Sequence, residues 1–232
     1  MNKTFYTIIA CLACILYYTF VHEGEQQEEI GSPAAECEQT ISHPEEASDA
    51  ENVKHFEIPV TTKRREEILL EQYGYTVSYN PNLCIPNWVA WELNAEKMVV
   101  RESRNSKFYP NPKLSEDKAV TTQEYTGSGW DRGHMCPAGD NKYHWRAMNE
   151  CFYMTNICPQ NHSLNSGDWK ELEEACRKWA EVEPVYIACG PIMYQTPQYG
   201  YIGKKFKIRV PDAFFKVVLT GLQSGKPRAI GF

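Results

Sequence analysis

Residues 131–135 read Asp-Arg-Gly-His-Met and directly follow the glycine-rich run Gly-Ser-Gly-Trp of residues 127–130. They place an acid, a guanidinium group, a flexible glycine and a base in consecutive positions. Downstream lie Asn-Ile-Cys-Pro-Gln at residues 156–160, Leu-Asn at residues 164–165, and then Glu173. Residues 125–173 therefore gather the candidate side chains of one site, and the flanking segments are expected to support it.

A helix is predicted close to Asn165. Apolar residues recur there at helical spacing and form a core-facing stripe: Trp169, Leu172, Cys176 and Trp179. Asp168 and Glu171 are placed as a possible capping pair. Asn165 then lies at the start of the helix, and Glu173 lies about two turns along and off the stripe. Both side chains could therefore face one ion, directly or through its waters.

Strands are predicted on both sides of this stretch. Aromatic and β-branched residues recur in short runs bounded by turn residues, at 75–79, 88–93, 185–192, 206–210, 213–219 and 229–232. One helix is predicted upstream of them, with Thr61 and Thr62 as its cap, the apolar residues 68–70 on its buried face and Gly74 at its end. This order predicts an α+β domain over residues 56–232, built on a mainly antiparallel sheet.

The N-terminal residues predict export. Residues 4–21 form an uncharged apolar run that is long for a signal-peptide core and short for a spanning helix. No small-residue cleavage site follows, which favours an uncleaved signal anchor at residues 1–21 over a cleaved peptide. A lipoprotein cleavage box at residues 8–11 is a further alternative. All three place the domain outside the cytoplasm, either membrane-anchored through residues 4–21 or periplasmic or secreted.

The acidic charge of the chain is concentrated in one segment. The formal net charge is −6, but ten acidic residues lie between Val21 and His55, with Lys54 as the only basic residue there. Without these residues and Lys3, the chain has 22 Lys and Arg against 20 Asp and Glu. Residues 22–55 lack an apolar period and are predicted to form a disordered tether. The domain itself is close to neutral, so its charge does not exclude a polyanionic substrate.

The residue types of the central stretch suit phosphodiester hydrolysis. This reaction needs a base to activate water, positive charge near the phosphoryl oxygens and usually a divalent metal that stabilises the leaving oxygen. His134 can supply the base, and Arg132 and Arg104 the positive charge. Because Mg²⁺ takes oxygen ligands and keeps most of its waters, the amide of Asn165 and the carboxylate of Glu173 can be enough to hold it.

Taken together, these motifs resemble the DNA/RNA non-specific endonuclease family, which includes endonuclease G and secreted bacterial nucleases. The resemblance covers most of residues 75–231 and rests on the runs 131–134, 155–160 and 164–165 together with Trp169, Leu172 and Glu173. It implies a ββα-metal finger inserted in a larger α+β domain with a mainly antiparallel sheet. Family members generally continue beyond the position of Phe232, which implies a truncated C-terminus.

The resemblance also implies roles for the residues around the metal. His134 would be the general base, and Asn165 would be the one direct protein ligand to Mg²⁺, for which Mn²⁺ or another divalent cation can substitute. Glu173 matches the acid that holds metal-bound water.

Four further residues acquire roles in the same way. Asn156 and Gln160 match polar residues that orient the site, and Gln160 is a candidate for substrate binding. Arg132 is the arginine of the motif, and Arg104 matches an upstream arginine that contacts phosphate. The implied activity is cleavage of DNA and RNA through phosphate contacts, with little sequence specificity and 5′-phosphate ends. A homodimer is left open.

Each candidate also has a plainer interpretation. His134 could be a turn residue with one hydrogen bond, Asn165 a helix cap and Glu173 an ordinary solvated acid. His144 and His162 are expected to be structural or loop residues. On a larger scale, the chain could be a catalytically silent nucleic-acid-binding or surface interaction module on the same fold.

Cysteines leave one more alternative. Six lie in the domain, and an exported domain could oxidise them. Cys151, Cys176 and Cys189 lie in apolar patterns as small core residues, and no pair in the domain has the close double spacing of a zinc site. Mostly free, buried thiols are therefore predicted, with a thiol-based redox or zinc protein as the third hypothesis.

Overall fold

The computed structural model describes residues 55–62 and 65–232. The predicted signal anchor at residues 1–21 and almost all of the tether at residues 22–55 lie outside these residues. Among the residues that are described, no helix combines the length and the apolarity needed to cross a membrane.

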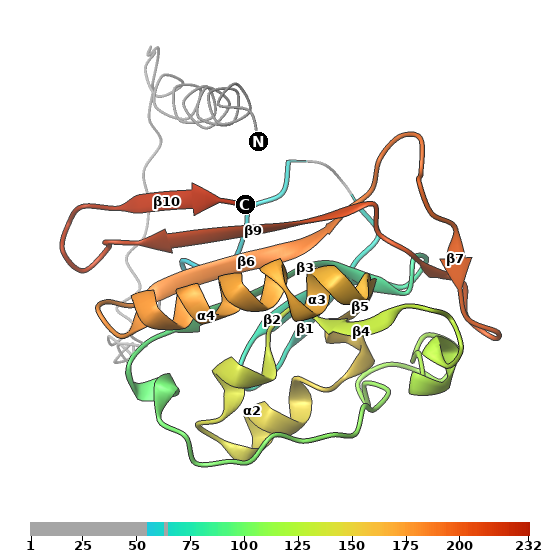
Figure 1. Cartoon of the computed structure of the whole chain (residues 1–232), viewed down its shortest axis with the longest axis horizontal. Helices are drawn as coiled ribbons and strands as arrows, with labels where there is room; N and C mark the ends of the chain where they lie inside the picture. Colours follow the sequence, from blue (N-terminus) through green and yellow to red (C-terminus); the bar gives the residue numbers. More distant parts are fainter. Residues whose placement is uncertain (1–54, 63–64) are drawn as a thin grey trace, which may run out of the picture. The chain divides into compact units, whose positions relative to one another are not determined.

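An antiparallel sheet organises the described domain (Figure 1). Its six strands have the order β1-β2-β3-β6-β9-β10 within the described residues, and each neighbouring pair is antiparallel. They are β1 (Ile68–Glu71), β2 (Thr76–Asn80), β3 (Ile85–Leu93), β6 (Val185–Ile192), β9 (Ala213–Thr220) and β10 (Arg228–Gly231). Every residue of β3 except Glu92 is buried, which shows that both faces of the centre of the sheet are covered. The predicted α+β fold with a mainly antiparallel sheet is confirmed.

The first strand corrects the helix predicted upstream of Gly74. Residues 68–71 pair with β2, with Ile68 opposite Tyr79 and Glu71 opposite Thr76. The helix prediction is wrong because the apolar residues 68–70 meet the free edge of β2, whose backbone groups satisfy those of β1. The strand predicted at residues 206–210 is also shorter than expected, since only β8 (Ile208–Arg209) pairs, with β7 (Tyr201–Ile202).

Helix α4 (Asp168–Ala180) lies across one face of the sheet, preceded by the short helix α3 (His162–Ser166) (Figure 1). The predicted stripe is largely confirmed, because Trp169 and Cys176 are buried and Leu172 packs against the core. Trp179 is the exception: it is 38% exposed and stacks on Phe232. The predicted capping pair is wrong, because both of its acids lie inside the first turn and Gly167 precedes α4 without a side-chain cap.

A two-stranded antiparallel pair, here called the β4–β5 hairpin, and several short helices lie on the same face of the sheet as α4, because Asp140 accepts from both Trp91 of β3 and Arg177 of α4. The hairpin consists of β4 (Asp131–His134) and β5 (Ile157–Gln160). The short helices are η1 (Glu96–Met98), η2 (Thr122–Tyr125), η3 (Ala138–Asn141), α2 (Trp145–Glu150) and η4 (Met154–Asn156). The six cysteines of the described domain are all buried and free, as predicted.

Candidate active site

The β4–β5 hairpin fixes the position of the Asp-Arg-Gly-His run. Antiparallel pairing places Gly133 opposite Cys158 and His134 opposite Ile157. A Cβ atom added to Gly133 would lie 2.6 Å from the Cβ atom of Gln160, which is too close for any larger residue. The glycine of the run is therefore required by the close packing of β4 on the Gln160 side chain.

His134 ends β4 in an apolar enclosure. Its ring centroid lies 4.8 Å from that of Phe152, edge to face, and 5.4 Å from that of Phe108. The residue is 8% exposed, and its buried Nε2 atom has no hydrogen-bond partner among the described residues. Burial lowers the pKa of His134 to about 3, and the positive charge of Arg104 contributes to this shift. The imidazole is consequently neutral at pH 7 and can accept a proton.

A pocket of about 260 Å³ opens beside this imidazole. It contains four of the predicted site residues, Arg104, His134, Asn165 and Glu173. The rest of its wall comes from residues that follow β4 or lie on α4: Pro137, Ala138, Gly139, Lys170 and Arg177. Two larger hollows, of about 570 and 540 Å³, lie elsewhere on the domain and include none of the predicted site residues.

Asn165 is held by an acid from β4. Its Nδ2 atom donates to Oδ2 of Asp131 at 2.9 Å, and Nδ1 of His162 lies 2.8 Å from the same oxygen. Burial would raise the pKa of Asp131, but the bonds from Asn165 and His162 outweigh it and lower the pKa. Because the amide nitrogen is engaged, the Oδ1 atom of Asn165, which has no hydrogen-bond partner in the described part of the chain, is the atom available to a ligand. Asn165 thus lies in the last turn of α3 and does not cap α4.

Glu173 reaches the pocket from α4, where it is half-buried. Burial raises the pKa of Glu173 to about 7, opposed by the positive charges of Lys216, Arg177 and Arg104. Arg177 in turn donates from Nη1 to Oδ1 of Asp140 at 2.8 Å. The acid is therefore poised to change its charge near neutral pH and to bind a cation or a hydrogen-bond donor.

Three predicted residues do not line the pocket. Asn156 is fully buried and accepts from the backbone nitrogen of Cys136 while donating to two backbone carbonyls, so it holds together the segments that follow β4 and α2. Gln160 is fully buried, and its amide has no hydrogen-bond partner among the residues described. Arg132 donates from Nε to Thr122 Oγ1 at 2.7 Å and from Nη2 to Thr122 O at 2.8 Å.

The sequence interpretation missed several charged residues near the pocket. Lys170 and Arg177 line it, and the spacing of Arg177 four residues after Glu173 on one helix would have placed both on the same face. Lys216 lies behind the pocket on β9, 1% exposed, with its Nζ atom 4.3 Å from the ring centroid of Trp169. The sequence shows only a single lysine within an apolar strand, and this pattern does not predict that the lysine lies near the pocket.

The fold and the pocket together define a ββα-metal nuclease fold on a mainly antiparallel sheet. The family model described as DNA/RNA non-specific endonuclease matches residues 52–232, and the chain belongs to this family. The predicted family is therefore confirmed.

Named relatives agree with this assignment. The mouse protein "Nuclease EXOG, mitochondrial" is 35% identical over 208 residues, which cover 79% of this chain and 56% of that protein. "Nuclease C1" of Cunninghamella echinulata is 32% identical over 74% of this chain and 71% of its own length. Bovine "Endonuclease G, mitochondrial" is 29% identical over 68% of this chain and 56% of its own length. The match thus spans little more than half of the mouse and bovine proteins.

A solved structure shows the same fold. The crystal structure of an EndoG/EndoGI complex, described as showing the mechanism of EndoG inhibition, contains a chain that superposes with a TM-score of 0.64 at 25% identity. The superposition covers 71% of this chain and 72% of that chain.

Proposed function

We propose that the chain is a divalent-metal-dependent endonuclease that hydrolyses phosphodiester bonds of DNA and RNA with little sequence specificity. The observation that carries this proposal is the pocket that holds a neutral imidazole, an oriented amide, a carboxylate and three basic side chains within one small volume. Such a set contains a base, a metal-binding oxygen and charge complementary to a phosphate.

His134 acts as the general base. A water molecule that enters the pocket loses a proton to the imidazole as it attacks phosphorus. The rings of Phe108 and Phe152 pack against the imidazole and fix its orientation, and its lowered pKa leaves it unprotonated at neutral pH. Proton transfer to a positioned base of this kind contributes about 10²–10⁴-fold to a rate.

Basic side chains neutralise the phosphate. Arg104, on the loop between η1 and η2, and Arg177, on α4, both line the pocket, and Lys170 adds a third positive charge. Arg132 keeps its Nη1 atom without a partner in the described residues, so we propose it as a further phosphate contact at the hairpin. Phosphate contacts carry no base information, which accounts for low sequence specificity.

The donor set fits Mg²⁺. Among the described residues, no group of three or more His, Cys, Asp or Glu side chains is placed to hold a metal ion. Asn165 offers Oδ1, and Glu173 offers a carboxylate that can hold metal-bound water. When bound, the cation stabilises the negative charge of the leaving 3′ oxygen. Mn²⁺ has the same preference for oxygen ligands and is proposed as a substitute.

Export is part of the proposal and rests on the apolar run at residues 4–21. The family includes proteins named mitochondrial and a fungal protein named Nuclease C1, so the relatives do not fix one compartment. Fractionation of cells that express the full chain would test this part. Recovery of the protein with the cytoplasm would contradict it.

Plasmid and RNA degradation by the full chain tests the activity. Cleavage of both in Mg²⁺ and its loss in EDTA are expected. Asn165→Ala is expected to abolish the Mg²⁺-induced rise in the thermal unfolding midpoint as well as cleavage, whereas Asn82→Ala, at an exposed amide between β2 and β3 that does not line this pocket, leaves both unchanged. Retention of DNA without metal-stimulated cleavage would favour the silent binding module instead.

A further inference from the structure

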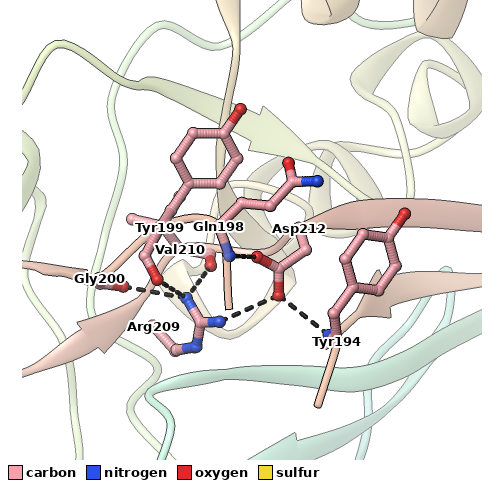
Figure 2. A network of polar contacts seen from close by, with 7 residues as sticks. All are labelled: Tyr194, Gln198, Tyr199, Gly200, Arg209, Val210 and Asp212. Carbon is pink, nitrogen blue, oxygen red and sulfur yellow. Dashed lines mark hydrogen bonds and ion pairs between the residues drawn. The ribbon is translucent and has the colours of Figure 1, made fainter. Parts of the chain in front are cut away.

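An arm of residues 193–209 leaves the sheet after β6 and carries the small β7–β8 pair. Figure 2 shows the polar network at its base. Arg209 is 5% exposed and donates from Nη2 to Oδ2 of Asp212 at 3.0 Å. Its Nη1 atom donates to backbone carbonyls, among them that of Tyr199 at 2.6 Å. Asp212 also accepts from the backbone nitrogens of Tyr194 and Gln198.

This network fixes the backbone of the arm and leaves tyrosine side chains outside it. In Figure 2 the rings of Tyr194 and Tyr199 point away from the Arg209–Asp212 pair. They are 46% and 43% exposed, and Tyr201 is 58% exposed with the Arg209 guanidinium 5.8 Å from its ring centroid. Three large rings within eight residues are therefore held toward solvent on a backbone that cannot collapse over them.

Two contacts tie the arm to the strand that carries the active-site motif. Tyr199 packs edge to face on Trp130, at 4.9 Å between ring centroids, and Trp130 directly precedes β4. The buried carboxylate of Glu124 accepts from the backbone nitrogen of Lys205 at 2.9 Å, and Glu124 lies on η2, whose Thr122 accepts from Arg132. The arm is thus anchored to the same hairpin that positions His134.

The turn of the arm is basic. Lys204, Lys205 and Lys207 are exposed between β7 and β8, in a turn that Gly203 opens with a φ of +98°. A surface that combines aromatic rings with lysines is suited to bind single-stranded nucleic acid, because unpaired bases stack on the rings while the lysines neutralise the phosphates. A duplex keeps its base faces covered, so it can use only the lysines.

We propose that residues 193–209, together with Trp130, form a platform that binds single-stranded nucleic acid next to the active site. Tyr194 and Tyr201 stack bases, Trp130 and Tyr199 form its link to β4, and the lysine turn holds the backbone of the strand. This proposal rests on the proposed nuclease function and adds a preference for single-stranded segments of DNA or RNA.

The platform is tested by measuring the affinity of the full chain for two labelled ligands by fluorescence anisotropy in EDTA. The ligands are a single-stranded 12-mer and the blunt duplex of the same sequence. Tyr194→Ala/Tyr201→Ala is expected to weaken single-strand binding by about 10–100-fold and duplex binding by less than about twofold. Lys204→Ala/Lys205→Ala is expected to weaken both and to reduce the log–log salt slope for the single strand by about 1.4.

Two controls keep the result interpretable. Trp145→Ala removes a ring that is 59% exposed on α2, and it should leave both affinities unchanged. The thermal unfolding midpoint should match wild type in both double variants and thereby show that the domain remains folded. Absence of plasmid and RNA cleavage by the wild-type chain in Mg²⁺ would contradict the nuclease proposal, while the anisotropy would still decide the platform.

Unchanged single-strand binding by the tyrosine variant would overturn the platform. Equal weakening of single-strand and duplex binding by that variant would overturn it as well, and so would an equal loss in Trp145→Ala.

Discussion

The Arg209–Asp212 pair and the surroundings of Glu173 both keep charged groups away from bulk water, but they pair those groups differently. The guanidinium of Arg209 and the carboxylate of Asp212 have protein partners in several directions. Around the pocket, the Nε2 atom of His134 and the Nζ atom of Lys216 are buried and lack hydrogen-bond partners within the described residues. Burial also raises the pKa of Glu173 to about 7.

This difference separates a structural role from a chemical one. A buried ion pair with its hydrogen bonds complete holds the backbone in place and has no capacity for a further ligand. A buried base without a partner costs stability and is retained where a substrate or water completes it. The arm is thus held in place by charged groups that have their hydrogen-bond partners, whereas the pocket keeps groups without such partners available for a ligand. The following substitutions test this contrast, from the largest expected effect to the smallest.

Removal of the imidazole affects activity far more than stability. His134→Ala is expected to lower kcat by about 10²–10⁴-fold, because the general base is lost. The unfolding midpoint should change by only a few degrees, since the lost packing is offset by removal of a buried unpaired nitrogen. Steady-state plasmid cleavage and thermal unfolding measure the two effects. His162→Ala, an exposed ring beside Asp131, is the control and should stay within about tenfold of wild type.

Loss of the buried amide of Asn156 affects stability first. Asn156→Ala removes three hydrogen bonds to buried backbone groups. We expect the free energy of unfolding to fall by about 2–4 kcal/mol, as measured by urea denaturation. If the amide also acts directly on the substrate, the fraction that remains folded will lose kcat to the same extent as His134→Ala. Nearly normal kcat in that fraction would assign Asn156 a structural role alone.

Lys216 should show the opposite pattern. Lys216→Met replaces a buried ammonium group by an apolar chain of similar length, so the protein should gain about 1–2 kcal/mol in stability. Activity should fall by about tenfold, because the charge that keeps the pKa of Glu173 down is lost. The pH–rate profile should shift to higher pH in parallel. Loss of stability together with unchanged activity would contradict the proposed role of this unpaired charge.

Asp212 should affect stability with little effect on chemistry. Burial would raise its pKa, but bonds from the backbone nitrogens of Tyr194 and Gln198 and the charge of Arg209 lower it. Because its pKa is lowered in the folded state, ionised Asp212 stabilises the folded protein at pH values above the ordinary pKa of aspartate. This stabilisation is lost as the pH falls through the pKa of the folded state. Asp212→Asn should therefore lower the unfolding midpoint at pH 7 by several degrees, with a smaller difference from wild type in acid. Cleavage should stay within about threefold.

The sequence predicted the residues of the candidate pocket better where they belong to a continuous run than where the fold brings distant segments together. The runs at 131–134 and 164–165 pointed to His134 and Asn165, and the structure places both of these residues in one pocket. Even the upstream Arg104, outside both runs, lies in the same pocket. The position of Lys216 was not predicted, because only the pairing of β9 with β6 brings this residue behind α4.

The secondary structure was likewise predicted better where the local sequence pattern alone determines it. Strands with their own periodicity, such as β3 and β6, were predicted within a few residues. Residues 68–71 were predicted as helix because their local signals favour one, and the edge of β2 decides otherwise. Local propensity is weak where a partner strand lies within reach.

The most direct test of the account is the ratio of cleavage rates of His134→Ala and Asp212→Asn on the same plasmid in Mg²⁺, with the full chain and at equal folded concentration. We expect a ratio of about 10⁻² or lower, because one variant removes the base and the other removes only a structural contact. Cleavage by His134→Ala that equals cleavage by Asp212→Asn would contradict the assignment of the buried, unpaired imidazole as the base.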